Sequence, residues 1–118
     1  EHLQEHPEVE LVWYDYWCMP QGNRTLAQKV RFDWMLENVN LLYLGLSVII
    51  LLDMSYLSRF WTQFEAWLSM QLPSTSGLVP APASEHRCII IPIHNASTAT
   101  RQELLSLWAQ RTPEEAKE

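Results

Sequence analysis

The sequence predicts an α/β fold built around a parallel sheet with flanking helices. Three apolar runs, at residues 9–16, 46–52 and 88–93, have the composition of buried strands. Each run is followed by a segment in which apolar residues recur at helical spacing. Three strand–helix pairs in succession favour a parallel sheet whose connections are right-handed crossovers.

Length and composition fit one globular domain. The chain has 118 residues, of which 47% are hydrophobic and 19% are charged. Its formal net charge is −6, and acidic residues are concentrated near the start. We therefore expect an acidic N-terminal segment at residues 1–8 ahead of a domain at residues 9–118. Because the basic residues are few and scattered, nucleic acid and anionic membrane surfaces are not expected partners.

Two observations bear on the compartment. The longest largely apolar run, residues 41–52, is shorter than the roughly 20 residues that a membrane-spanning helix needs, so we interpret it as core and predict no transmembrane segment. The two cysteines, Cys18 and Cys88, are too few for a disulfide framework. A reducing, cytoplasmic location is therefore favoured, with a single disulfide as the alternative.

The first predicted pair is a strand at residues 9–16, rich in Val, Trp and Tyr, and a helix that follows it. Thr25 and Gln28 have the spacing of a capping box, which places the start of the helix. Gly45 is expected to close this helix in a left-handed conformation. The apolar stripe of the helix consists of Phe32, Met35, Leu36 and Val39.

In the second pair, the run at residues 46–52 is typical of a strand covered on both faces. Ser58 is expected to cap a helix that extends to about Gln71. The apolar side of that helix carries Trp61, Phe64 and Leu68. Residues 72–86 are rich in Pro and Ser, and we predict a loop there.

The third pair begins with a strand at residues 88–93, whose one proline favours the end of the strand or a sheet edge. Thr100 and Glu103 are predicted to form the capping box of the third helix. Thr112 and Glu115 repeat this spacing near the end of the chain, so a further helix is expected to begin there. On this basis we expect the chain to be a fragment of a longer protein.

Polar residues follow each predicted strand. In open parallel sheets, ligands bind at the carboxyl ends of the strands, and loops from neighbouring strands meet there. The residues at these positions are Asp15, Cys18 and Gln21 after the first strand, Asp53, Ser55 and Ser58 after the second, and His94 and Asn95 after the third. We therefore expect a ligand cleft at this edge of the sheet.

Several classes of site are not indicated by the sequence. The three glycines are far apart, so neither a dinucleotide-binding fingerprint nor a phosphate-binding P-loop occurs. His2 and His6 are four residues apart but lack the glutamate of a zinc-binding helix, so we predict no metal site. No histidine is positioned by the sequence to activate Cys18, which favours a small buried residue over a nucleophile.

One segment is more specific than the rest. Trp13, Asp15, Cys18 and Gln21 have the spacing of the signature of the heterokaryon-incompatibility (HET) domain, and the segment resembles that domain. HET domains are relatives of the Toll/interleukin receptor (TIR) domain. We expect this segment to shape a ligand cleft or an interface.

A second segment is similar to a TIR motif in which Ser-x-x-Trp-Cys-x-x-Glu follows a strand and opens a helix. Ser58, Trp61 and Glu65 match this motif, whereas Thr62 replaces the usual Cys. The resemblance covers residues 9–70, about half of the chain. We expect Ser58 and Trp61 to lie at the same cleft or interface as Asp53.

The resemblance implies a flavodoxin-like sheet whose first strand and helix would precede Glu1. It implies a signalling or assembly module that acts through self-association or protein partners. As an alternative, it implies an enzyme that cleaves the nicotinamide–ribose bond of NAD, with NAD as the substrate and Glu65 as the catalytic residue. A carboxylate at that place stabilises an oxocarbenium-like ribosyl centre. The structural alternative for Glu65 is a solvated residue on the flank of its helix.

A third reading is a degenerate copy of the fold that is kept as a structural subunit of a larger complex. It rests on Thr62, which departs from the TIR motif. It rests also on three tryptophans outside the predicted apolar stripes, which suit burial against a partner or against missing parts of the chain. These are Trp17, Trp34 and Trp67.

Overall fold

The computed structural model describes residues 2–117 and divides into two compact units. The N-terminal unit is Glu1–Asn38 and the C-terminal unit is Val39–Glu118. Cys18 in the first unit and Cys88 in the second are free thiols. None of the helices in the described chain combines the length and apolar composition that crossing a bilayer requires.

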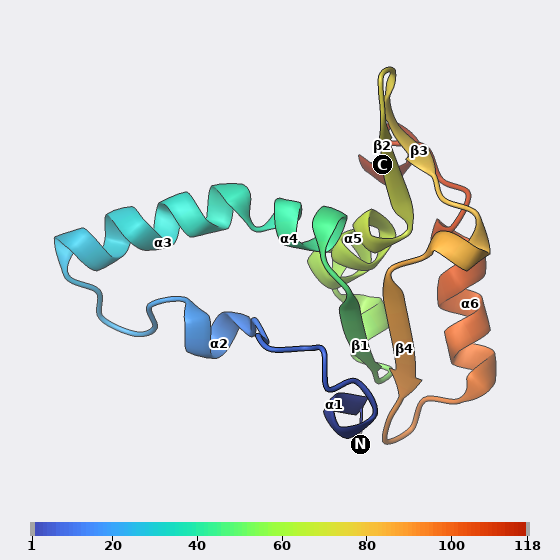
Figure 1. Ribbon diagram of the computed structural model, residues 1–118, viewed down its shortest axis with the longest axis horizontal. Helices are drawn as coiled ribbons and strands as arrows, with labels where there is room; N and C mark the ends of the chain where they lie inside the picture. Colours follow the sequence, from blue (N-terminus) through green and yellow to red (C-terminus); the bar gives the residue numbers. More distant parts are fainter. Residues whose placement is uncertain (1, 118) are drawn as a thin grey trace. The chain divides into compact units, whose positions relative to one another are not determined.

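The N-terminal unit contains the short helices α1 (His2–Glu5) and α2 (Asp15–Cys18) and the longer helix α3 (Leu26–Asn38) (Figure 1). The predicted strand at residues 9–16 is wrong: residues 9–14 have no regular structure, and α2 begins at Asp15. Strand propensity reflects packing on a pleated surface more than a backbone preference. The described part of this unit holds no strand with which the apolar run pairs.

The capping box of α3 is confirmed. The backbone N–H of Thr25 donates to Oε1 of Gln28 over 2.9 Å, and the N–H of Gln28 donates to Oγ1 of Thr25 over 3.2 Å. The predicted stripe is covered only in part, since Phe32, Met35 and Val39 are half-buried and Leu36 is exposed. No residue of α3 is fully buried. This helix therefore presents apolar side chains to solvent.

The C-terminal unit begins with α4 (Asn40–Gly45), which ends without the predicted left-handed glycine. Among the described glycines, only Gly22 and Gly77 have positive φ. Instead, Leu46 is extended and its N–H donates to the Leu42 carbonyl over 2.9 Å. A helix can end in this way because the extended residue leaves the axis while its N–H still satisfies a terminal carbonyl.

The prediction of a parallel sheet is confirmed in part: the second and third runs pair in parallel, and the first forms no strand. Strand β1 (Val48–Leu52) pairs in parallel with β4 (Cys88–Pro92), in register from Val48 opposite Cys88 to Leu52 opposite Pro92 (Figure 1). Pro92 is the last residue of its strand, as expected of a residue that lacks an N–H. The fold is therefore mixed, with helices, a small parallel sheet and a separate antiparallel strand pair.

The core lies on one face of this sheet. Helices α5 (Phe60–Ser69) and α6 (Thr98–Trp108) pack there and contact β1 and β4, respectively. Trp67 is fully buried in this core rather than left for a partner. The remaining buried residues of the cluster are Ile50, Leu52, Ala66, Leu68, Met70, Ile90, Leu104, Trp108 and Ala116.

No other described element of the C-terminal unit covers the opposite face of the sheet, so within this unit the prediction that the run at residues 46–52 is covered on both faces is wrong. Ile49 and Leu51 of β1 are 42% and 56% exposed, and Ile89 and Ile91 of β4 are 41% and 38% exposed. The register places Ile49 opposite Ile89 and Leu51 opposite Ile91. We call these four side chains the open sheet face. Parallel sheets normally bury both faces, which makes this exposure informative.

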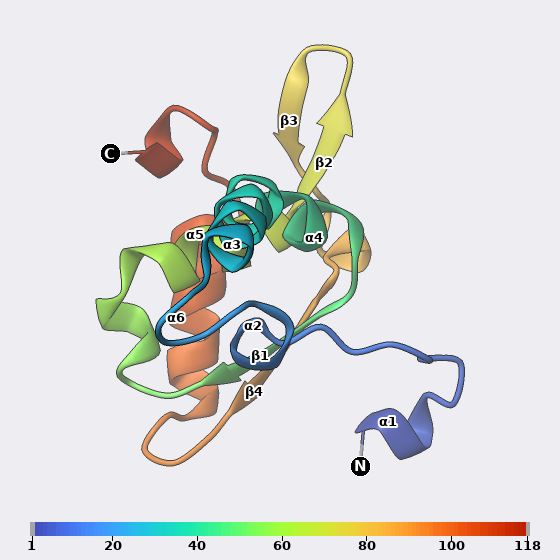
Figure 2. The same cartoon turned by 90° about the vertical axis from the view of Figure 1, so that its left-hand side faces the viewer.

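The predicted loop at residues 72–86 contains a β-hairpin. Strand β2 (Gln71–Ser74) pairs antiparallel with β3 (Gly77–Pro80), and a short 3₁₀ turn, η2 (Ala83–Glu85), follows. The hairpin projects from the rest of its unit (Figure 2). In a two-stranded hairpin both strands are edges, which explains why Pro73 and Pro80 are tolerated. Gly77 has φ of 111°, a conformation that favours glycine at this turn.

Two predicted helix starts are wrong. Arg59 precedes α5, and Ser58 ends the 3₁₀ turn η1 (Tyr56–Ser58) with no capping bond to the helix. The N-cap of α6 is Ser97, whose hydroxyl accepts from the N–H of Thr100 over 3.3 Å. Thr100 is thus the inner partner of the capping box and not its first residue.

The box near the chain's end is confirmed, since the N–H of Thr112 donates to Oε2 of Glu115 over 2.9 Å. The reciprocal bond runs from the Glu115 N–H to Oγ1 of Thr112 over 3.4 Å. The helical segment that follows is the 3₁₀ turn η3 (Glu115–Lys117).

Candidate functional site

The segment that resembles the HET signature folds around α2. The side-chain amide of Gln21 donates to the carbonyl oxygens of Met19 and Asp15 over 3.1 and 3.4 Å. The Asp15 carboxylate accepts from the N–H of Tyr16 over 2.7 Å. The side chains of Asp15 and Gln21 therefore form hydrogen bonds with the backbone of this same segment. Cys18 ends α2 as a half-buried thiol.

The aromatic residues of this segment differ in exposure. Trp13 is half-buried, whereas Trp17 is 82% exposed and its ring meets Tyr14 edge-on at 5.3 Å between centroids. Trp34 on α3 is also exposed. Large aromatic side chains on a surface are the residue types that anchor protein interfaces.

The carboxyl edge of the β1–β4 sheet brings predicted site residues together. The N–H of Ile93 donates to the Leu52 carbonyl over 2.9 Å, and the N–H of Met54 donates to Oδ1 of Asn95 over 3.4 Å. His94 between them has φ of 52°, a left-handed conformation that costs about 1 kcal/mol for a residue with a side chain. The loops after the two strands therefore meet, as parallel geometry predicts.

Asp53 organises the loop after β1. Its Oδ1 accepts from the hydroxyl of Ser55 over 2.7 Å and from the N–H of Tyr56 over 2.9 Å. These two hydrogen bonds, the Ser55 bond first, lower the pKa of the Asp53 carboxyl. The hydroxyl of Ser58 donates to the carbonyl of Ser55 over 2.7 Å, so Ser58 belongs to the same turn.

Trp61 and Glu65 are one turn apart on α5. Trp61 is 70% exposed, and Glu65 is half-buried. The hydroxyl of Tyr56 donates to the carbonyl of Thr62 over 2.6 Å, and Oγ1 of Thr62 donates to the carbonyl of Tyr56 over 3.1 Å. Thr62, which stands where the TIR motif has Cys, thus holds the start of α5 against η1.

The pKa of Tyr56 is affected by Glu65. Burial, and after it the negative charge of Glu65, raises the pKa of the Tyr56 hydroxyl well above its usual range. Glu65 therefore lies within electrostatic range of a buried phenol in the same unit. A half-buried carboxylate one helical turn from an accessible indole is a combination that suits binding of a planar cation.

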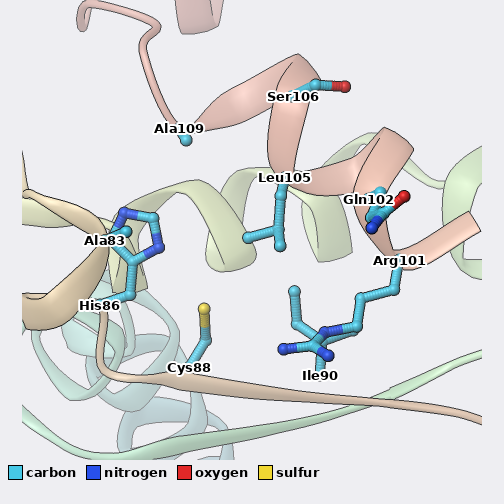
Figure 3. A pocket seen from close by; sticks show the side chains of 9 residues that line it. All are labelled: Ala83, His86, Cys88, Ile90, Arg101, Gln102, Leu105, Ser106 and Ala109. Carbon is cyan, nitrogen blue, oxygen red and sulfur yellow. The ribbon is translucent and has the colours of Figure 1, made fainter. Parts of the chain in front are cut away.

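Residues that sequence reasoning missed line a cavity of about 500 Å³ between α6, β4 and η2 (Figure 3). Its polar lining includes His86, Cys88, Arg101 and Gln102, and its apolar lining includes Ile90 and Leu105. These residues share no sequence motif, since His86 lies in the predicted loop and Arg101 lies in a helix. One signal was available in the sequence: Cys88 and Ile90 are two residues apart in a predicted strand, which places their side chains on the same face.

The described chain contains no cluster of side chains suited to hold a metal ion. Within residues 2–117, no group of three or more His, Cys, Asp or Glu side chains is arranged to hold an ion. The rings of His2 and His6 lie 4.4 Å apart, and Nδ1 of His6 contacts the Glu8 carboxylate at 2.9 Å.

The predicted site residues thus form two groups, each in its own unit. Trp13, Asp15, Cys18 and Gln21 belong to the N-terminal unit, and the carboxyl-edge residues with Glu65 belong to the C-terminal unit. Comparison of the chain with protein-family models, with curated proteins and with solved structures finds no match.

Proposed function

We propose that the chain is a TIR- or HET-like signalling or assembly module that acts by self-association. The open sheet face carries this proposal. Four branched aliphatic side chains stand in two cross-strand pairs, Ile49 with Ile89 and Leu51 with Ile91, and each is 38–56% exposed. A parallel sheet normally has a second layer packed on such a face. The open sheet face of a second copy of the chain is equally apolar and can serve as that layer.

The expected strength of this association follows from the apolar area. Complete burial of an aliphatic side chain contributes about 1.5–3 kcal/mol, and about half of each of these four remains to be buried. The gain is therefore about 4 kcal/mol per chain, or about 8 kcal/mol for two. Loss of translational and rotational freedom costs about 4 kcal/mol at the low end of its range. At that cost, association through this face alone is weak, near the millimolar range.

The test is the molar mass of the full chain as a function of concentration, measured by sedimentation equilibrium. We expect mass to rise with concentration in the wild type and to stay monomeric in Leu51→Lys. Lysine is chosen because it reduces the net negative charge, so general repulsion cannot account for a loss of association. A wild type that stays monomeric at millimolar concentration would overturn the proposal.

Leu107→Lys is the matched control. Leu107 is 42% exposed on α6, the helix that covers the opposite face of the sheet, and the substitution is chemically identical. We expect this variant to associate as the wild type does. Equal loss of association in both variants would show that the open sheet face is not the contact.

The second candidate function is cleavage of NAD, and one observation favours it. Glu65 is half-buried and acts electrostatically on Tyr56, while the indole of Trp61 is accessible one turn away on α5. An accessible indole suits stacking with a nicotinamide ring, and a carboxylate suits stabilisation of an oxocarbenium-like ribosyl centre.

Nicotinamide release from NAD by the full chain at high concentration tests this second function. We expect release to be abolished in Glu65→Gln and retained in Glu103→Gln, an exposed glutamate on α6. If a chain that is shown to be folded and associated releases no nicotinamide, NAD cleavage is ruled out and only the assembly function remains.

A further inference from the structure

The cavity between α6, β4 and η2 differs in charge from the chain as a whole. The protein carries a net charge of −6, yet no Asp or Glu lines this cavity. Its one permanently charged group is the guanidinium of Arg101, in the first turns of α6. The side chain of Arg101 extends along the cavity beside Ile90 (Figure 3).

Arg101 has no anionic partner in the described chain. Within residues 2–117, His6 and Glu8 form an ion pair, whereas the Arg101 guanidinium forms neither an ion pair nor a hydrogen bond with another described residue. An arginine presents five N–H donors in a planar fork that matches a carboxylate in a bidentate manner. These donors are available to a ligand in the cavity.

The neighbouring polar groups are held in place by the protein. Nε2 of His86 lies 3.2 Å from the carbonyl oxygen of Ala81 and must donate to it, because a carbonyl only accepts. The hydroxyl of Ser106 donates to the carbonyl of Glu103 over 3.0 Å. The imidazole of His86 and the thiol of Cys88 face the space below Leu105 (Figure 3). The cavity thus combines fixed polar groups with an apolar wall.

We infer that this cavity binds a small organic carboxylate with an apolar body. The carboxylate pairs with Arg101, and the apolar body lies against Ile90 and Leu105. A volume of about 500 Å³ is within the range of small-molecule sites. No described Asp or Glu lines the cavity, so no carboxylate of the lining competes with a ligand for the Arg101 guanidinium. This site is separate from the open sheet face, so either inference can fail without the other.

Cys88 provides a chemical probe of the cavity. Iodoacetate and iodoacetamide are similar in size, and each alkylates a thiolate sulfur by forming a sulfur–carbon bond while iodide leaves. Iodoacetate carries the carboxylate that Arg101 is expected to bind, and iodoacetamide does not. Cys18, a free half-buried thiol in the other unit, serves as the internal reference.

We expect the iodoacetate-to-iodoacetamide rate ratio to be roughly tenfold higher at Cys88 than at Cys18, as one charge-assisted pair implies. Mass spectrometry of the two cysteine peptides from the full chain gives both rates. Arg101→Gln should bring the Cys88 ratio to that of Cys18, whereas Arg59→Gln, an exposed arginine outside the cavity, should leave it unchanged.

A measurement on the unsubstituted chain makes the test independent of any variant. Benzoate should slow alkylation of Cys88 by iodoacetate and leave Cys18 unaffected, and benzamide, its uncharged counterpart, should protect far less. Equal ratios at Cys88 and Cys18 in the wild type would overturn the inference. Equal protection by benzoate and benzamide would do so as well, because it would show that the carboxylate is not recognised.

Discussion

The indole N–H of Trp108 donates a hydrogen bond to Oε1 of Gln63 over 3.0 Å and so joins α6 to α5. Trp108 is 7% exposed and belongs to the core cluster on the closed face of the sheet. The two helices that form this face are therefore connected by a polar bond as well as by apolar contact. This bond forms between residues far apart in the sequence.

Replacement of Trp108 by Phe should lower the free energy of unfolding by about 2 kcal/mol. The substitution removes indole volume from the core and leaves the Gln63 oxygen without its donor. Urea denaturation followed by circular dichroism measures the loss. Trp61→Phe is the matched control, because Trp61 is exposed and its replacement should change stability by less than about 0.5 kcal/mol. Equal losses would show that Trp108 is not a core residue.

Leu51 and Leu52 are consecutive residues on opposite faces of β1, and they should respond differently to alanine. Leu52 is fully buried, so Leu52→Ala should cost about 2–5 kcal/mol through lost burial and a residual cavity. Leu51 is 56% exposed, so Leu51→Ala should cost less than about 1 kcal/mol in the monomer. Chemical denaturation at low concentration makes the comparison. Similar costs would mean that the open sheet face is covered within the chain.

The correctly predicted parts of the fold depend on short-range signals. The capping boxes at Thr25 and Thr112 form because their partners lie three residues further along the chain. The strands at Val48–Leu52 and Cys88–Pro92 are predictable as continuous apolar runs, and their parallel pairing follows from the helix between them. The meeting of the Met54 and Asn95 loops follows from the same geometry.

The wrong predictions concern features that depend on distant parts of the chain. The run at residues 9–16 has the composition of a strand, but composition does not supply a neighbouring strand. An apolar run also does not indicate whether Ile49 and Leu51 face a second layer, because a buried strand and a half-open strand of aliphatic residues read alike. The cavity was missed because Cys88 and Arg101 meet only when α6 packs on β4.

Acid should weaken the C-terminal unit partly through Asp53. Hydrogen bonds from Ser55 and Tyr56 lower the pKa of this carboxyl below its unfolded value of about 4. The folded state therefore favours the ionised form. Its contribution to stability is fully present above about pH 4 and is lost as the pH falls through the lower folded pKa. We expect the urea midpoint of the wild type to fall over this window.

Asp53→Asn should reduce that fall, because the amide oxygen still accepts both hydrogen bonds but does not titrate. Urea midpoints of both proteins at neutral pH and below pH 4 provide the measurement. Glu103→Gln is the control, since the exposed Glu103 side chain accepts no hydrogen bond from the described residues, and Ser106 bonds only to its backbone carbonyl. An unchanged acid response in Asp53→Asn would show that its hydrogen bonds do not favour the ionised form.

The Tyr56 hydroxyl should ionise later than an exposed phenol. Burial and then the charge of Glu65 raise its pKa above the unfolded value of about 10. The stabilisation of the protonated form is fully present below about pH 10 and is lost as the pH rises through the higher folded pKa. The ultraviolet absorbance of phenolate measures this ionisation, and its difference between the wild type and Tyr56→Phe isolates the signal of Tyr56.

Glu65→Gln should move the ionisation of Tyr56 to lower pH, because it removes one negative charge that opposes formation of the phenolate. The value should remain above that of a free tyrosine, since burial is the larger cause and is unchanged. Glu85→Gln, an exposed glutamate on η2, should leave the ionisation where it is. If Glu65→Gln does not shift the ionisation of Tyr56, the Glu65 carboxylate does not act electrostatically on the Tyr56 phenol. The proposal of NAD cleavage would then lose the observation that favours it.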